Sequence, residues 1–183
     1  MAAGRAKVVV LDRDGVINED SGEFIKSVDE WRPIPGSLEA IAALTRGGHR
    51  VAVVTNQSGV GRGLFSEEVL AAIHRRMSDA VRAAGGALAG IYYCPHHPDA
   101  DCPCRKPKTE LLHRLEQDLA CSLAGAPFVG DRFSDLDAAA AIGARAILVR
   151  TGTGTATERE LGDRSVEVFD DLSAAARAIL AAG

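Results

Sequence analysis

Two aspartates separated by one residue are the side chains in this sequence best suited to chemistry. Asp12 and Asp14 follow the apolar run 8–11, and Gly15 comes directly after them. Two carboxylates at this spacing suit an oxygen-coordinated Mg²⁺ beside a phosphate. An aspartate can also attack phosphorus while its neighbour moves a proton. The alternative is an ordinary turn after a strand, because Asp and Gly are common turn residues.

Two later segments carry polar residues that suit phosphate chemistry. Thr55, Asn56 and Ser58 precede a glycine-rich turn, where a hydroxyl and backbone N–H groups could hold phosphate oxygens. That segment could also be a polar loop whose glycines serve turn geometry. Lys106 can neutralise a nucleophile and a phosphoryl group, and Arg105 can bind a second anion in bidentate fashion. The alternative for this basic pair is a solvated surface position.

A third segment supplies further carboxylates after the apolar run 127–129. Asp131 would complete a Mg²⁺ site with the first two aspartates. Asp135 is either a further ligand, a support for the ligands, or a residue favoured at a helix N-terminus by the helix dipole.

Strand-like and helix-like segments alternate along the chain, which predicts an α/β fold with a doubly wound parallel sheet. Because ligands bind at the carboxyl ends of the strands in such sheets, the polar segments are expected to meet there. The connections after the first two strands are too short for a cap domain, so we expect an open site in a single domain, 1–183. The predicted strands are 8–11, 51–54, 91–93, 127–129, 146–149 and 166–169.

The predicted helices are recognised by apolar spacing and by residues that begin or end them. Ser66 and Thr109 are expected to cap two of them, and the threonine-rich stretch 151–157 to be a flexible connection before a helix starting at Glu158. The predicted helices span 37–46, 67–84, 110–119, 135–142 and 172–180.

The segment 94–104 predicts a zinc-binding loop. Cys94, Cys102 and Cys104, with either His96 or His97, supply the ligands of a tetrahedral Zn²⁺. Four protein ligands leave no open position, so the zinc would be structural and would place Arg105 and Lys106. The alternative for each cysteine is a small buried apolar side chain. That alternative suits Cys121 best, on a helix away from the cluster.

Composition narrows the remaining function classes. The net charge of −4 gives no basic surface for nucleic acid, and the apolar runs are too short to span a membrane. No secretion signal is recognised at the N-terminus, so we expect a cytoplasmic protein. Nothing in the sequence demands a dimer, so we expect a monomer. His49, His74 and His113 are interpreted as surface or capping residues.

The segments DRDGVIN, VVTNQ, RKP and VGDRFSD occur in the order and spacing of the haloacid dehalogenase-like phosphatases. The chain resembles that family over nearly its whole length. More narrowly, LDRDG, TNQSGVGRG, YYCPHHP, CPCRKP and LVRTG are similar to a group that contains heptose 1,7-bisphosphate phosphatases and histidinol-phosphate phosphatases. Val16 departs from the pattern, since many members have Thr there.

The resemblance implies chemical roles for the matching residues. Asp12 would be the nucleophile that takes the phosphoryl group, and Asp14 the acid that protonates the leaving oxygen and then activates water. Mg²⁺ would be held by the Asp12 side chain, the Asp14 backbone carbonyl and Asp131. Thr55 and Lys106 would steady the phosphoryl group.

The resemblance also implies substrate contacts and one choice within the zinc loop. Arg105 would recognise the substrate, Arg132 stands where some relatives have Lys, and His96 is favoured over His97 as the zinc ligand. A loop that aligns with sugar-contacting residues, and the segment after the second strand, complete the expected substrate site: Asp20, Ser21, Gly22, Glu23, Asn56, Gln57 and Ser58.

These features predict a Mg²⁺-dependent phosphatase acting on a small phosphorylated sugar. The resemblance implies removal of the C7 phosphate of a heptose 1,7-bisphosphate, in the synthesis of activated heptose for lipopolysaccharide. The alternatives are a histidinol-phosphate phosphatase on the same scaffold and a non-catalytic zinc-stabilised binding module. The binding module is disfavoured because all the charged residues of the site are present.

Overall fold

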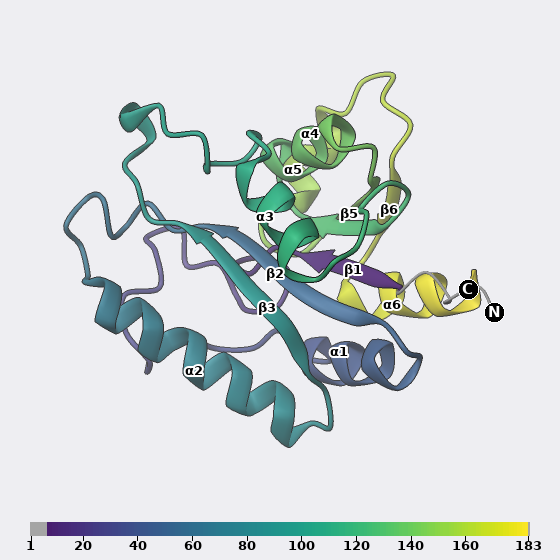
Figure 1. The fold of residues 1–183 in the computed structure, drawn as a ribbon, viewed down its shortest axis with the longest axis horizontal. Helices are drawn as coiled ribbons and strands as arrows, with labels where there is room; N and C mark the ends of the chain where they lie inside the picture. Colours follow the sequence, from purple (N-terminus) through teal and green to yellow (C-terminus); the bar gives the residue numbers. More distant parts are fainter. Residues whose placement is uncertain (1–6, 183) are drawn as a thin grey trace.

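The computed structural model describes residues 7–182, which form a six-stranded parallel sheet with the order β3-β2-β1-β4-β5-β6 (Figure 1). Strand β1 lies inside the sheet, and the chain leaves it first toward β2 and later returns to β4 on its other side. The strand order therefore reverses beside β1, which is where open α/β sheets bind ligands. The strands are β1 (Val8–Leu11), β2 (Arg50–Asn56), β3 (Leu88–Cys94), β4 (Pro127–Gly130), β5 (Arg145–Val149) and β6 (Glu167–Phe169).

Helices cover both faces of the sheet (Figure 1). Side chains of α1, α2 and α6 pack on one face with Val9 and Leu11 of β1. Side chains of α3 and α4 pack on the other with Val8 and Val10, since successive strand residues point to opposite faces. The predicted doubly wound α/β fold is confirmed. The helices are α1 (Ser37–Arg46), α2 (Glu67–Ala83), α3 (Glu110–Asp118), α4 (Phe133–Ala141), α5 (Gly154–Arg159) and α6 (Leu172–Ala181), with one 3₁₀ turn, Pro98–Ala100.

Of the two predicted helix caps, the structure confirms one and contradicts the other. The Ser66 side chain accepts from Val69 N at 3.4 Å, as expected of a cap. Thr109 makes no such bond, so its predicted capping role is wrong. Its backbone is at φ −104° and ψ 3°, whereas capping side chains normally depend on an extended backbone to reach the next turn.

Three further expectations are corrected by tertiary packing. The stretch 151–157 is not a flexible connection, because α5 begins at Gly154 and Thr157 is buried. His49 and His74 are buried rather than on the surface, whereas His113 is exposed. Cys121 lies beyond the end of α3, not on a helix, and is half-buried.

The connections that follow β1 and β2 contain little regular structure. In residues 12–36 and 57–66 the structure has only isolated bridges and turns. Within residues 7–182, no helix has the length and apolar character needed to cross a membrane.

Candidate active site

Lys106 is a buried cation between two carboxylates at the end of β1. Its Nζ lies 3.0 Å from Asp12 Oδ1 and 2.6 Å from Asp135 Oδ1, and it donates to the Val54 carbonyl at 2.7 Å. Burial alone lowers the pKa of Lys106, but Asp12 and Asp135 outweigh it and raise that pKa above its ordinary value. The lysine therefore stays charged inside the protein.

A third buried carboxylate, Asp131, joins the two that pair with Lys106. Oxygens of Asp12, Asp131 and Asp135 all lie within 4.8 Å of one another. Burial, followed by the charge of Asp135, raises the pKa of Asp12 to about 7, although Lys106 acts to lower it. The same two causes raise the pKa of Asp131 to about 6. The cluster holds more negative charge than Lys106 balances, so it is suited to bind a cation.

The donor set of this cluster fits Mg²⁺. Asp131 Oδ1 is buried without a hydrogen-bond partner, while its Oδ2 accepts from Thr153 N at 2.8 Å. Both oxygens of Asp135 already accept hydrogen bonds. Oδ1 accepts from Lys106, and Oδ2 accepts from the backbone N of Asp131 and of Arg132. Hard oxygen ligands suit Mg²⁺. Asp12 and Asp131 are therefore the side chains that could hold the ion, and Asp135 orients its neighbours.

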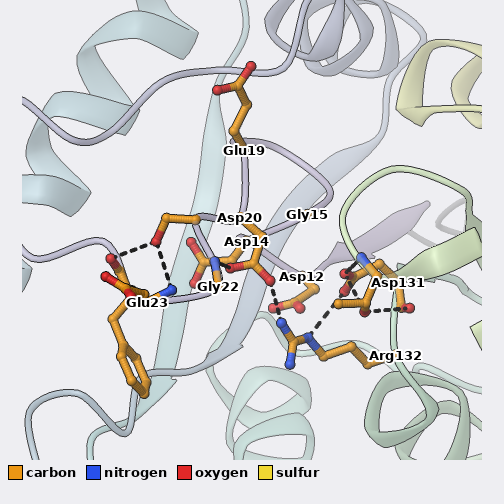
Figure 2. Close-up of polar contacts among 12 residues, drawn as sticks. Asp12, Asp14, Gly15, Glu19, Asp20, Gly22, Glu23, Asp131 and Arg132 are labelled. Atoms are coloured by element: carbon orange, nitrogen blue, oxygen red, sulfur yellow. Dashed lines mark hydrogen bonds and ion pairs between the residues drawn. The ribbon is translucent and has the colours of Figure 1, made fainter. Parts of the chain in front are cut away.

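The Asp14 carboxylate is held by side chains from three directions. Arg13 donates to both of its oxygens at 3.0 Å, Asn18 Nδ2 to Oδ1 at 2.8 Å, and Gln57 Nε2 to Oδ2 at 2.8 Å. Burial raises the pKa of Asp14, but Arg13, Asn18 and Gln57 outweigh it and lower that pKa. Asp14 thus carries a fixed, ionised carboxylate that remains partly open to solvent. Figure 2 shows it beside Asp12.

Threonines that follow β5 hold Asp131 and the segment beside it. These threonines were not predicted as site residues from the sequence. Thr153 donates to Asp131 from both N and Oγ1, and Thr157 Oγ1 donates to the Asp131 carbonyl at 2.7 Å. Thr151 Oγ1 donates to the Gly15 carbonyl at 2.6 Å. Gly15 itself has φ 80°, and a Cβ there would collide with the Asp131 carboxylate. The signal available in the sequence was a run of hydroxyls at the end of an apolar strand.

A cavity of about 230 Å³ opens beside these groups and collects most of the predicted site. Ser134 and Phe24 also line it and were not predicted. A larger hollow of about 980 Å³ beside β3 and α3 includes none of the clustered carboxylates. The predicted residues that line the smaller cavity are Asp12, Asp14, Asp20, Gly22, Thr55, Asn56, Ser58, Arg105, Lys106 and Arg132.

Four predicted substrate-binding residues are engaged within the protein. Gln57 is buried and donates to Asp14 and to Thr55 Oγ1. The Asn56 amide pairs with the Lys106 backbone at 3.0 and 3.1 Å, which ties the end of β2 to that residue. Ser21 and Glu23 lie in the exposed loop, where Ser21 Oγ accepts from Glu23 N.

Two arginines line the rim of the cavity. The Arg132 guanidinium donates to the Asp20 carboxylate, which joins the loop after β1 to the start of α4 (Figure 2). Arg105 differs, because its Nη1 is buried and has no hydrogen-bond partner. A buried cationic donor without an acceptor is costly, so this group is suited to meet an anion.

The loop after β3 brings together the predicted zinc ligands. Cys94 Sγ lies 3.4 Å from Cys102 Sγ, and His96 Nδ1 lies 3.2 Å from Cys104 Sγ. These separations approach the roughly 3.8 Å edge of a tetrahedron built on Zn–S bonds of about 2.3 Å. His97 instead accepts from Asp99 N, which favours His96. The cluster could hold zinc.

Known proteins are similar to this chain in sequence and in fold. The family model described as HAD-hydrolase-like matches residues 103–175. D-glycero-β-D-manno-heptose-1,7-bisphosphate 7-phosphatase from Pseudomonas putida is 47 % identical over 174 residues, covering 95 % of this chain and 99 % of its own. The corresponding enzyme from Bordetella bronchiseptica is 46 % identical over 175 residues, covering 95 % and 98 %.

A solved structure extends the comparison to the fold. The crystal structure of D,D-heptose 1,7-bisphosphate phosphatase from B. bronchiseptica, complexed with magnesium and phosphate, has a TM-score of 0.93. It is 45 % identical and covers 97 % of this chain and 99 % of its own. The fold and the carboxylate cluster define a haloacid dehalogenase-like hydrolase. Within that class, the chain belongs to the family of the D-glycero-β-D-manno-heptose-1,7-bisphosphate 7-phosphatases.

Proposed function

We propose that this chain is a Mg²⁺-dependent phosphatase that removes the C7 phosphate of D-glycero-β-D-manno-heptose 1,7-bisphosphate and leaves the C1 phosphate. The observation that carries the proposal is the buried group of Asp12, Lys106 and Asp131 at the end of β1. Relatives at 46–47 % identity over nearly the whole chain are named for this reaction. The product would supply the synthesis of nucleotide-activated heptose.

In the proposed reaction, the Asp12 carboxylate attacks phosphorus and forms an aspartyl phosphate. The leaving C7 oxygen takes a proton from Asp14, and Asp14 then takes a proton from the water that releases phosphate and restores Asp12. The negative charge of the bound phosphate opposes the low pKa of Asp14 and helps it carry the first proton. Thr55 and Lys106 would bind the phosphoryl oxygens.

The ion would be held by Asp12, Asp131 and the Asp14 backbone carbonyl. Bound there, Mg²⁺ would reduce the repulsion between an anionic nucleophile and an anionic phosphate. Asp135 would not bind the ion, because hydrogen bonds already occupy both of its oxygens.

We infer that the C1 phosphate is recognised by Arg105, which lines the cavity and whose Nη1 has no hydrogen-bond partner. Replacing Arg105 by Ala is expected to lower kcat/KM for the bisphosphate about tenfold to a hundredfold, the cost of one charge-assisted contact. Hydrolysis of heptose 7-phosphate, which lacks that phosphate, should change little. Arg114→Ala, at an exposed position on α3, is the matched control. Equal losses on both substrates would remove this role from Arg105.

Removing zinc is expected to loosen the segment that carries Lys106, because Cys104 lies two residues before it. The variant Cys102→Ser should lose bound zinc and unfold at a lower temperature, and its turnover should fall. Metal content, thermal unfolding and phosphate release measure these effects. Cys121→Ser is the control, since Cys121 lies outside the cluster. A variant that lacks zinc but keeps full stability would contradict a structural zinc.

Steady-state kinetics with Mg²⁺ test the proposed substrate. Both anomers of heptose 1,7-bisphosphate would be compared with histidinol phosphate and fructose 1,6-bisphosphate. We expect kcat/KM for the β anomer to exceed that for histidinol phosphate and fructose bisphosphate at least about a hundredfold, or roughly 2.7 kcal/mol. Equal or better turnover of histidinol phosphate would keep the phosphatase chemistry and overturn the substrate.

We further infer that residues 1–183 act as one catalytic domain and a monomer in the cytoplasm, without nucleic-acid or membrane partners. A single sheet carries the described site, and the net charge of −4 offers no basic surface, which supports the inference. Light scattering on the purified protein tests the oligomeric state.

A further inference from the structure

The guanidinium of Arg13 lies beside the Asp14 carboxylate, and the Arg13 side chain is fully buried. Its Nε and Nη2 donate to the two Asp14 oxygens, which fixes the carboxylate in the plane of the arginine fork. Its Nη1 points elsewhere and lies 3.3 Å from His74 Nε2. A buried charge is stable only where its donors have such partners. The orientation of Asp14 therefore depends on how Arg13 is held.

His74 presents the acceptor to Arg13 from the buried face of α2. Burial and then Arg13 lower its pKa to about 3, so the imidazole is neutral. With its proton on Nδ1, Nε2 is free to accept from the arginine. The Tyr93 ring contacts His74 edge-on, at 5.4 Å between centroids, and restrains the imidazole. The histidine is thus a fixed neutral acceptor placed 61 residues from Arg13 in sequence.

We propose that His74 is a positioning residue for the reaction: it holds the Arg13 fork, and the fork holds the Asp14 carboxylate where the leaving oxygen needs a proton. The proposal rests on the proposed function, in which Asp14 supplies that proton. Without His74, Nη1 becomes a buried donor with no partner, and the guanidinium turns to find another acceptor. Misplacement of a reacting group by about 1 Å can cost about a hundredfold in rate.

Two substrates with different leaving groups can distinguish a positioning role of His74 from a merely structural one. A sugar oxygen is a poor leaving group and needs a proton as the P–O bond breaks, whereas 4-nitrophenolate leaves as a stable anion without one. For both substrates, kcat/KM reports the steps up to formation of the aspartyl phosphate. A misplaced Asp14 should therefore slow the sugar phosphate selectively, while general destabilisation should affect both substrates alike.

The experiment compares kcat/KM of His74→Leu on heptose 1,7-bisphosphate and on 4-nitrophenyl phosphate. We expect a loss of about tenfold to a hundredfold on the sugar substrate and less than about threefold on the aryl phosphate. His74→Gln should recover most of the lost activity, because its amide oxygen can accept from Arg13. Met77→Ala, buried on the same helix, should lower the unfolding temperature without this selectivity.

Asp14→Asn is the reference for the proposed function. If it loses activity equally on both substrates, the proton-donating role of Asp14 itself is wrong. If Asp14→Asn is selective but His74→Leu is not, only the positioning role of His74 is overturned. Should His74→Leu fail to fold, His74→Phe provides the same test, since phenylalanine keeps a ring beside Tyr93 but offers no acceptor to Arg13. An unselective His74→Phe variant would likewise overturn the proposal.

Discussion

The variant Asp12→Asn is expected to lose turnover by about 10⁴-fold or more while keeping its fold. Asparagine has nearly the same shape as aspartate but cannot attack phosphorus to form the acyl phosphate. Neither heptose 1,7-bisphosphate nor 4-nitrophenyl phosphate should be turned over, because both reactions need the nucleophile. Phosphate release and covalent trapping of labelled phosphate on the protein measure the loss. Normal trapping in the variant would assign the nucleophile to another residue.

The same substitution should leave the free energy of unfolding unchanged or increase it when metal is chelated. Asp12, Asp131 and Asp135 lie close together, and Lys106 pairs with only two of them, so removal of one carboxylate reduces repulsion among buried charges. Lys106 keeps its closer partner, Asp135, at 2.6 Å. Added Mg²⁺ should narrow the difference in unfolding free energy between the variant and the unchanged protein, since the ion stabilises the cluster that keeps Asp12. A large loss of stability in chelator would show that Asp12 supports the fold.

Replacing Lys106 by Met is expected to damage both stability and catalysis. Methionine fills a similar volume but leaves Asp12 and Asp135 facing each other without a cation. Breaking a buried ion pair by removing one partner costs about 3–5 kcal/mol. Loss of a charge that stabilises the phosphoryl group should lower kcat by about 10²–10³-fold or more. Chemical unfolding and phosphate release measure the two effects.

Lys108→Met is the matched control for this variant. Lys108 lies two residues away, is substantially exposed and pairs with an exposed Asp101 at 2.5 Å. Exposed ion pairs contribute about 0–1 kcal/mol, so little change in stability or rate is expected. Similar losses in the two variants would mean that the segment, rather than the buried charge, is responsible.

The strands, the layered fold and most of the site could be predicted from the sequence because their signals are local. Short apolar runs mark buried parallel strands, and polar residues directly after them must lie at one edge of the sheet. Asp12, Thr55 and Asp131 were found in this way, whereas Lys106 was recognised as a cation that suits a phosphoryl group; all four were expected to meet there. The cysteine spacing likewise predicted a metal-binding loop, but it did not decide whether His96 or His97 is the fourth ligand.

Only the tertiary structure decided which partners hold these residues in place. Asn56 turned out to bond the Lys106 backbone 50 residues away, and Thr153 to bond Asp131 22 residues away. His74 was interpreted as a surface or capping residue, yet it is buried and contacts Arg13 across 61 residues. Local patterning determines which face of an element is buried, but a buried polar group chooses among all the acceptors that packing brings near it. That choice depends on the assembled fold, so the sequence determined the reacting groups and the structure determined what orients them.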